Sequence, residues 1–135
     1  MVNKITEDSI IPMIISGIPA FKSYYDKEIE YWGEDTPTGC QVGWFAHFIA
    51  EIFVEQKKEP VMLQQCFDLI EKLLVEGDEQ VKNYMYFFFI ESLVNIIGHE
   101  GIGYEVLLPY LGPYSKKALN KINAFWLEGK IIEEL

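Results

Sequence analysis

The sequence predicts an all-α fold of about six helices, packed as antiparallel helical hairpins. Three observations lead to this prediction. Apolar residues recur at spacings of three and four along most of the chain, which places them on one face of a helix. Glycine, proline and aspartate punctuate these stretches in the way that helix ends require. No stretch alternates apolar and polar residues beside a hairpin turn, so we expect no sheet.

Length and composition predict one folded domain, residues 1–135. The chain has 135 residues, of which 50% are hydrophobic and 15% are aromatic. A chain of this length can bury a core of its own. The composition is too apolar for a disordered chain, in which low hydrophobicity fails to offset the entropy of ordering.

The first third of the chain predicts two helices and a loop. Residues 8–16 predict a helix that tolerates Pro12 near its first turn. Residues 20–32 predict a second helix, with aromatic side chains spaced along it. The stretch GEDTPTGCQVG, residues 33–43, contains three glycines and a proline, so we expect a loop there.

Two longer helices are expected next, over residues 42–58 and 60–76. Pro60 suits the first turn of the second helix, where its missing N–H is no loss. Gly77 is expected to end that helix in the left-handed conformation, and Asp78 to cap the start of the next. A joint this short predicts antiparallel neighbours.

The remaining chain predicts a helix over residues 79–97, a short segment over 104–111 and a last helix over 113–127. Three glycines within residues 98–103 make continuation of the first of these helices costly. Gly112 is expected to end the short segment, and Pro113 to begin the last helix. In the last helix we expect four apolar side chains to face inward: Leu119, Ile122, Phe125 and Trp126.

A weak internal repeat accompanies this pattern. The phrases FIAEIF and FIESLV begin at Phe48 and Phe89, which are 41 residues apart. That spacing is near the period of repeats built from helix pairs. A stacked, HEAT-like arrangement is therefore one form that the predicted hairpins can take.

Glu91 follows the most apolar stretch of the chain, residues 84–90. A helix that is apolar on nearly every side is expected to be surrounded by other helices, so Glu91 should be half-buried. Because an unpaired buried carboxylate is costly, we expect a structural acid that accepts hydrogen bonds from a helix end, tyrosine hydroxyls or Asn95. The alternative is a catalytic acid with a raised pKa, but no base, nucleophile or metal ligand lies nearby in the sequence.

The sequence predicts no catalytic residue, no cofactor and no metal site, and hence no enzyme. His47 and Glu51 are four residues apart, which can hold a metal on a helix, but the other histidine, His99, lies in the glycine-rich turn. Cys40 has no neighbouring base in the sequence to activate it. Cys66 is expected in the core, and two cysteines at this separation indicate no disulfide framework.

The charge balance excludes some partners. There are 11 basic and 21 acidic residues, giving a net charge of −10, so the surface repels phosphate backbones and we expect no nucleic-acid ligand. The longest apolar run falls far short of the roughly 20 residues that span a bilayer, so we expect no membrane partner. The acidic excess fits either a basic protein partner or a surface that keeps the chain soluble.

The N-terminal residues predict the location of the protein. Glu7 and Asp8 lie where a signal peptide carries positive charge, so we expect a cytoplasmic protein.

One stretch combines aromatic and acidic residues in a way that is typical of recognition surfaces, because aromatic residues anchor interfaces. An alternative role for its aromatic side chains is a hydrophobic clamp on the adjoining loop. The candidate partner-binding residues are Glu28, Tyr31, Trp32, Glu34 and Asp35.

Four phrases of the chain are distinctive as a group: EYWGED (residues 30–35), LIEKLLVEGDEQVKN (69–83), FIESLVNI (89–96) and LLPYLGPYSKKALNKINAFW (107–126). Together they resemble a family of small, acidic, uncharacterised bacterial proteins that carry an all-helical domain of unknown function, and the likeness covers nearly the whole chain. Proteins of this size and charge are similar to bacterial immunity proteins, which neutralise toxins. The resemblance implies no catalytic residue.

These observations predict a non-enzymatic protein-binding domain, with an immunity-type inhibitor of a basic toxin as its specific form. The alternative is a helical adaptor or scaffold module. A large secreted toxin-like gene just upstream would favour the inhibitor, whereas an isolated gene or a metabolic operon would favour the adaptor.

Overall fold

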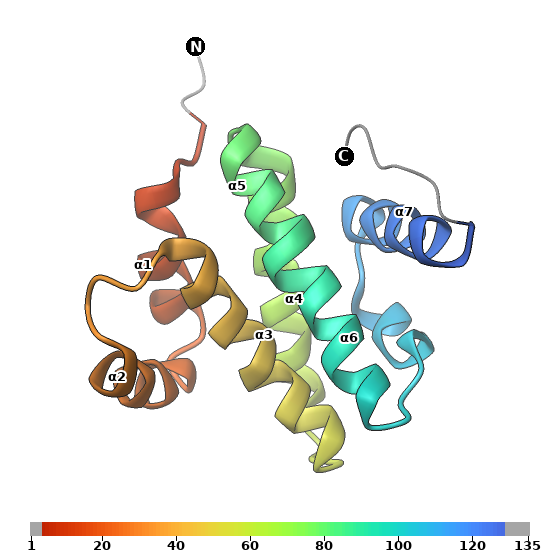
Figure 1. Ribbon diagram of the computed structural model, residues 1–135, viewed down its shortest axis with the longest axis horizontal. Coiled ribbons are helices and arrows are strands. Elements are labelled where there is room, and N and C mark those ends of the chain that lie inside the picture. Colours follow the sequence, from red (N-terminus) through yellow and green to blue (C-terminus); the bar gives the residue numbers. More distant parts are fainter. Residues whose placement is uncertain (1–3, 129–135) are drawn as a thin grey trace.

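The computed structural model describes the backbone of residues 4–128 and the side chains of residues 4–124. The all-α prediction is confirmed, since the β structure in this part of the chain is limited to one isolated bridge between Ile5 and Gly77. The elements are α1 (Glu7–Gly17), α2 (Phe21–Trp32), α3 (Thr38–Val54), α4 (Pro60–Glu76), α5 (Glu79–Asn83), the π-helical η1 (Tyr84–Ile90), α6 (Glu91–His99), the 3-10 segment η2 (Tyr104–Tyr110) and α7 (Pro113–Glu128) (Figure 1).

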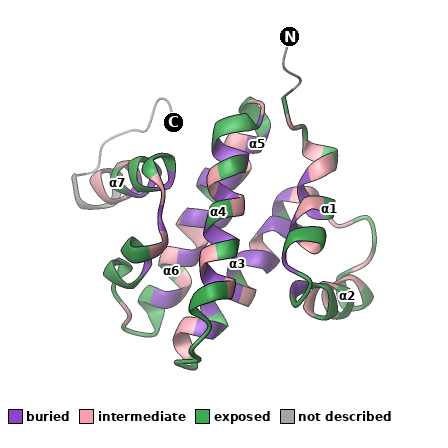
Figure 2. Cartoon of the chain, turned by 180° about the vertical axis from the view of Figure 1, so that it is seen from behind, coloured by how far each residue is buried: buried purple, intermediate pink, exposed green. Residues whose placement is uncertain are grey.

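The longest helices form the centre of the molecule. Helices α5, η1 and α6 follow one another without a break and lie beside α3, with α4 behind them; α1 and α2 lie on one side, and η2 and α7 on the other (Figure 1). The main packing partners of α3 are η1 and α6, and not α4, which follows it in the sequence. Buried residues gather on the central helices, whereas α2 is mostly exposed and buries only Phe21 (Figure 2).

Most helix ends agree with the sequence prediction. Helix α1 is one residue longer than predicted at each end, α2 and α7 differ by one residue at one end, and α4 has the predicted bounds. The helix predicted to run to residue 58 ends earlier, at Val54. Cys66 lies in the hydrophobic core as expected. The side chains of Phe125 and Trp126 lie outside the described residues. Among the helices of residues 4–128, none has both the length and the apolar character that crossing a bilayer requires.

The predicted loop over residues 33–43 is wrong in its second half, because α3 begins at Thr38. Gly39 and Gly43 lie within this helix, and Gly39 allows a close approach to η1. A Cβ atom on Gly39 would lie 3.1 Å from the ring of Phe88, and one on Gly43 would lie 4.0 Å from the Phe88 carbonyl oxygen. Tertiary packing here outweighs the low helix propensity of glycine.

The helix predicted over residues 79–97 is continuous to His99, but its middle is π-helical. A π-helix bonds each residue to the fifth along, which changes the register of the side chains. Tyr86 and Ile90 are consequently buried, whereas Phe87 and Phe88 are 44% and 40% exposed. The expectation of a helix surrounded by other helices on every side was therefore wrong.

The joint between α4 and α5 depends on two residues. Asp78 caps α5 as predicted, because its Oδ1 accepts a hydrogen bond of 2.9 Å from the backbone N–H of Val81. Gly77 is not left-handed, since its φ is −75°. It is required for space instead, because a Cβ atom there would collide with the Leu73 carbonyl oxygen and the Val81 side chain.

The start of α7 is capped by a side chain from α4. The Glu71 carboxylate accepts hydrogen bonds from the backbone N–H groups of Tyr114 and Ser115, at 2.8 and 2.9 Å, and from the Ser115 hydroxyl at 2.6 Å. It thereby satisfies donors that a helix start leaves free, and its charge is favourable there. Gly112 leaves room for it, since a Cβ atom on Gly112 would lie 2.6 Å from Glu71 Cδ.

Replacing Glu71 with alanine should lower the free energy of unfolding by about 1–3 kcal/mol, because three donors lose their acceptor. Glu71→Gln keeps one acceptor oxygen and should lose less. Urea denaturation measures both changes. Asp68→Ala is the control, since Asp68 is an exposed carboxylate one turn earlier on α4. Equal losses for Glu71→Ala and Asp68→Ala would contradict the capping role.

Candidate partner-binding site

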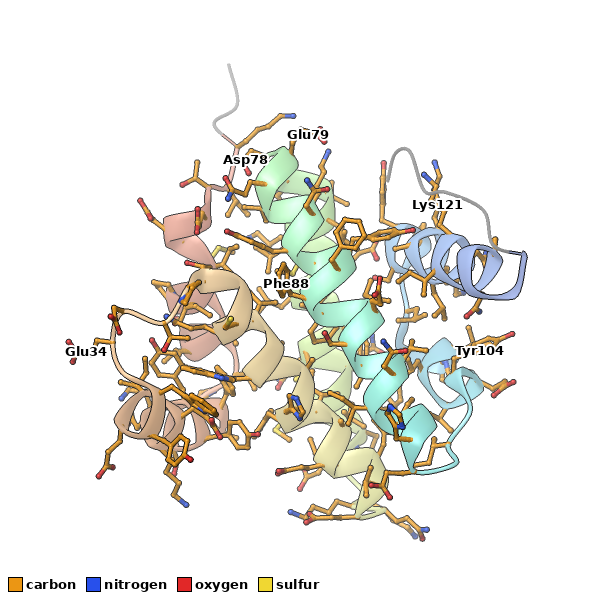
Figure 3. The ribbon with its side chains drawn as sticks, in the orientation of Figure 1. Glu34, Asp78, Glu79, Phe88, Tyr104 and Lys121 are labelled. Atoms are coloured by element: carbon orange, nitrogen blue, oxygen red, sulfur yellow. The ribbon has the colours of Figure 1, made fainter. Side chains whose placement is uncertain are left out.

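The five residues of the predicted recognition surface lie together where α2 passes into α3. Tyr31 and Trp32 end α2, and their side chains are 78% and 60% exposed. Glu34 and Asp35 follow in the loop and are exposed, and Glu34 projects outward from it (Figure 3). Glu28, one turn earlier on α2, is half-buried. The exposure of both rings argues against a buried clamp on the loop.

The indole of Trp32 is held in place although it is exposed. Its Nε1–H donates a hydrogen bond of 2.9 Å to Glu28 Oε2. The ring of Tyr31 packs edge-on against it, with ring centroids 4.7 Å apart and an interplanar angle of 77°. An aromatic side chain fixed in this way loses little conformational entropy when a partner covers it.

The loop beside Trp32 is also fixed. Gly33 has a φ of 101°, a conformation that glycine adopts without strain. The Thr36 hydroxyl donates to the Gly33 carbonyl oxygen at 2.7 Å, and Gln41 Nε2 donates to the Thr36 carbonyl oxygen at 2.7 Å. Gln41 is buried, and its Oε1 accepts from the Tyr25 hydroxyl at 2.9 Å. The loop is therefore tied to both α2 and α3.

A groove opens beside Trp32, with a volume of about 530 Å³. It joins an exposed indole, Trp32, to a nearly buried one, Trp44, whose ring packs edge-on against Tyr25 at 5.8 Å. The five residues predicted from the sequence did not include the α3 residues that line this groove, because that helix was expected to begin only at residue 42. The lining residues are Trp32, Asp35, Thr36, Pro37, Cys40 and Trp44.

The electrostatics of this region favour a cation. None of the groove's lining residues is basic, and Asp35 lies among them. The nearby Lys22 is paired with Asp26 at 2.7 Å. Burial raises the pKa of the Tyr25 hydroxyl, and the charges of Asp26 and Glu34 raise it further, as expected in a negative field. A basic side chain entering the groove would thus be attracted.

The other chemical candidates lie apart from this groove. His47 and Glu51 are exposed on α3, whereas His99 ends α6. Within the described part of the chain, no three histidine, cysteine or acidic side chains are grouped as a metal site would need. Cys40 is an exposed free thiol, and burial raises the pKa of the Cys66 thiol to about 12.

Glu91 is half-buried, as expected, but its contacts differ from the prediction. Among the side chains described, those of residues 4–124, its carboxylate accepts no hydrogen bond, and burial raises its pKa above the ordinary value of 4.5. In the same range, the Tyr86 hydroxyl is buried without a hydrogen-bond partner. Burial, and then the charge of Glu91, raise the pKa of Tyr86 to about 12. The capping role that we expected of Glu91 is performed by Glu71.

Comparison with known proteins gives a family without an assigned activity. The family model described as Domain of unknown function (DUF7674) matches residues 11–127, which include the groove and Glu91. No curated protein and no solved structure matches the chain.

The raised pKa of Glu91 predicts a specific pH dependence. Between the ordinary pKa and the raised folded pKa, the native state binds more protons than the unfolded state, so the stability rises as the pH falls through this window. Above this pH window Glu91 is charged in the folded state, and the partial burial of that charge lowers the stability of the fold. Glu91→Gln should therefore melt at the same or a higher temperature than the wild type at pH 7, and this advantage should vanish toward pH 4.

Thermal melts between pH 4 and pH 8 measure this difference. Glu100→Gln is the matched control, because it removes an exposed carboxylate next to the end of α6 and corrects for the overall acidic charge. A Glu91→Gln variant that is clearly less stable at pH 7 would show that the carboxylate accepts hydrogen bonds after all.

Proposed function

The chain belongs to the family described as Domain of unknown function (DUF7674), and from this premise we propose that it is a non-enzymatic protein-binding domain with a basic partner. The main support for the proposal is the state of Trp32 at the edge of the groove. Trp32 is 60% exposed, yet its side chain is held by contacts with Glu28 and Tyr31. Exposed aromatic residues of this kind anchor protein interfaces.

Charge supports a basic partner. Glu34 and Asp35 are exposed beside Trp32, on a chain whose net charge is −10. Complementary charges speed the encounter of two proteins and select the partner, while a buried aromatic anchor slows dissociation. Trp32 and the acids would therefore have separable roles in binding.

An immunity-type inhibitor of a basic toxin is the specific form that we propose. It is supported by the small size and acidity of the chain, and by its resemblance to bacterial proteins of this kind. An inhibitor that acts inside the producing cell would be cytoplasmic, and the free thiols of Cys40 and Cys66 are compatible with a reducing compartment.

A second candidate is a helical adaptor or scaffold module. Large apolar side chains are also exposed away from the groove, on η1, η2 and α7, and an adaptor needs more than one interface. These side chains are Phe87, Tyr104, Val106, Leu108 and Tyr114.

Binding kinetics test the role of the groove. The wild-type chain is used to isolate a basic partner from cells that produce it, and association and dissociation are then measured at two salt concentrations. Glu34→Lys combined with Asp35→Lys should slow association about tenfold and flatten its salt dependence, because steering is electrostatic and screened by salt. Trp32→Ala should speed dissociation at least about tenfold.

The control for charge is Glu76→Lys combined with Glu100→Lys, which makes the same change of charge at exposed positions away from the groove. It should leave the dissociation rate unchanged and slow association less than the groove pair does. Binding that is indifferent to both groove variants would contradict the proposal and favour the adaptor.

A further inference from the structure

The groove beside Trp32 presents an aromatic surface that suits a cation. A positive group is attracted to the face of an aromatic ring, and tryptophan gives the strongest interaction. The Trp32 ring remains 60% exposed after its contacts with Glu28 and Tyr31. An incoming side chain therefore meets an indole whose orientation is already set.

The acids in and around the groove are not equally available. One oxygen of the Glu28 carboxylate accepts the Trp32 Nε1–H. Among the side chains of residues 4–124, the carboxylates of Glu34 and Asp35 have no hydrogen bond or ion pair. Asp35 lines the groove, and its Oδ1 lies 3.0 Å from the position that a Cβ atom on Gly33 would take. Asp35, which carries an uncommitted carboxylate, thus lines the same groove as the exposed indole.

An indole beside a free carboxylate favours arginine over lysine. The guanidinium group is planar, so it can stack on a ring while its N–H groups form paired hydrogen bonds with a carboxylate. It is also less strongly hydrated than an ammonium group, so less is lost when it leaves water. The groove's remaining surface, from Pro37, Cys40 and Trp44, can cover the aliphatic part of the side chain.

We propose that this groove binds one arginine side chain of the protein partner, with its guanidinium group on Trp32 and against Asp35. This inference rests on the proposed protein-binding function and adds the chemistry of recognition to it. Glu34, exposed outside the groove, then acts on the encounter rather than on the bound arginine.

Three short peptides that differ at one position test the proposal. The central residue is arginine, lysine or citrulline, which is the neutral isostere of arginine, between glycine and serine residues. NMR titration at low salt follows the indole N–H signals of Trp32 and Trp44. We expect saturable shifts with the arginine peptide, binding about threefold weaker with lysine, and binding at least about fivefold weaker with citrulline.

Variants of the protein assign the interaction. Asp35→Asn should weaken binding of the arginine peptide about fivefold and change binding of the citrulline peptide much less, because citrulline keeps N–H donors but lacks the charge that strengthens the pair. Trp32→Phe keeps a ring and should weaken binding less than Trp32→Ala. Glu30→Gln is the control, since Glu30 is an exposed acid on the same helix that does not line the groove, and it should bind like the wild type.

Two results would overturn the arginine proposal: no saturable shift with the arginine peptide, or equal binding of the arginine and citrulline peptides. Its failure can be separated from that of the proposed function. If a basic partner binds in a way that depends on Trp32 but is unaffected by Asp35→Asn, the protein-binding function is supported and arginine recognition is contradicted. If the peptides bind with the expected preferences but no protein partner is found, arginine recognition by the groove is supported and the protein-binding function is contradicted.

Discussion

The structure depends on the close contact between Gly39 of α3 and the ring of Phe88 in η1, where a Cβ atom on the glycine would lie only 3.1 Å from the ring. This contact positions the first turn of α3 against the central helix (Figure 3). Gln41, two residues later, ties the loop through the Thr36 carbonyl oxygen, and Trp44, one turn further, lines the groove. A packing constraint between α3 and η1, at a partly exposed ring, therefore bears on the geometry of a surface site.

The acidic residues of this chain occupy three physically different states. Asp78 and Glu71 are caps whose charges are met by helix N–H groups, so they stabilise the fold. Glu91 is half-buried with no acceptor role among the described residues, so its charge is a cost. Glu34 and Asp35 are exposed and uncommitted, which leaves them free to meet a partner. Net charge alone does not distinguish these states, whereas burial and hydrogen bonding do.

The sequence predicted features that depend on neighbouring residues and missed those that depend on tertiary contacts. Pro60, Asp78 and Pro113 mark helix starts through local chemistry. The candidate recognition surface could be proposed from the sequence because its residues lie within two turns of one helix and its loop. The beginning of α3 was missed because glycine breaks an isolated helix but also permits close helix packing. The Glu71 cap joins residues 43 positions apart, and the π-helical register of η1 follows from packing, so neither has a local signal.

A double-mutant cycle between Gly39 and Phe88 tests the central constraint most directly. Gly39→Ala should lower the free energy of unfolding by about 1–3 kcal/mol, because the new methyl group overpacks the ring. In a Phe88→Ala background the same change should cost little, or stabilise, since alanine is the better helix former. Gly39→Ala alone should also shift the indole N–H signals of Trp32 and Trp44. An equal effect of Gly39→Ala in both backgrounds, with unchanged indole signals, would contradict the account.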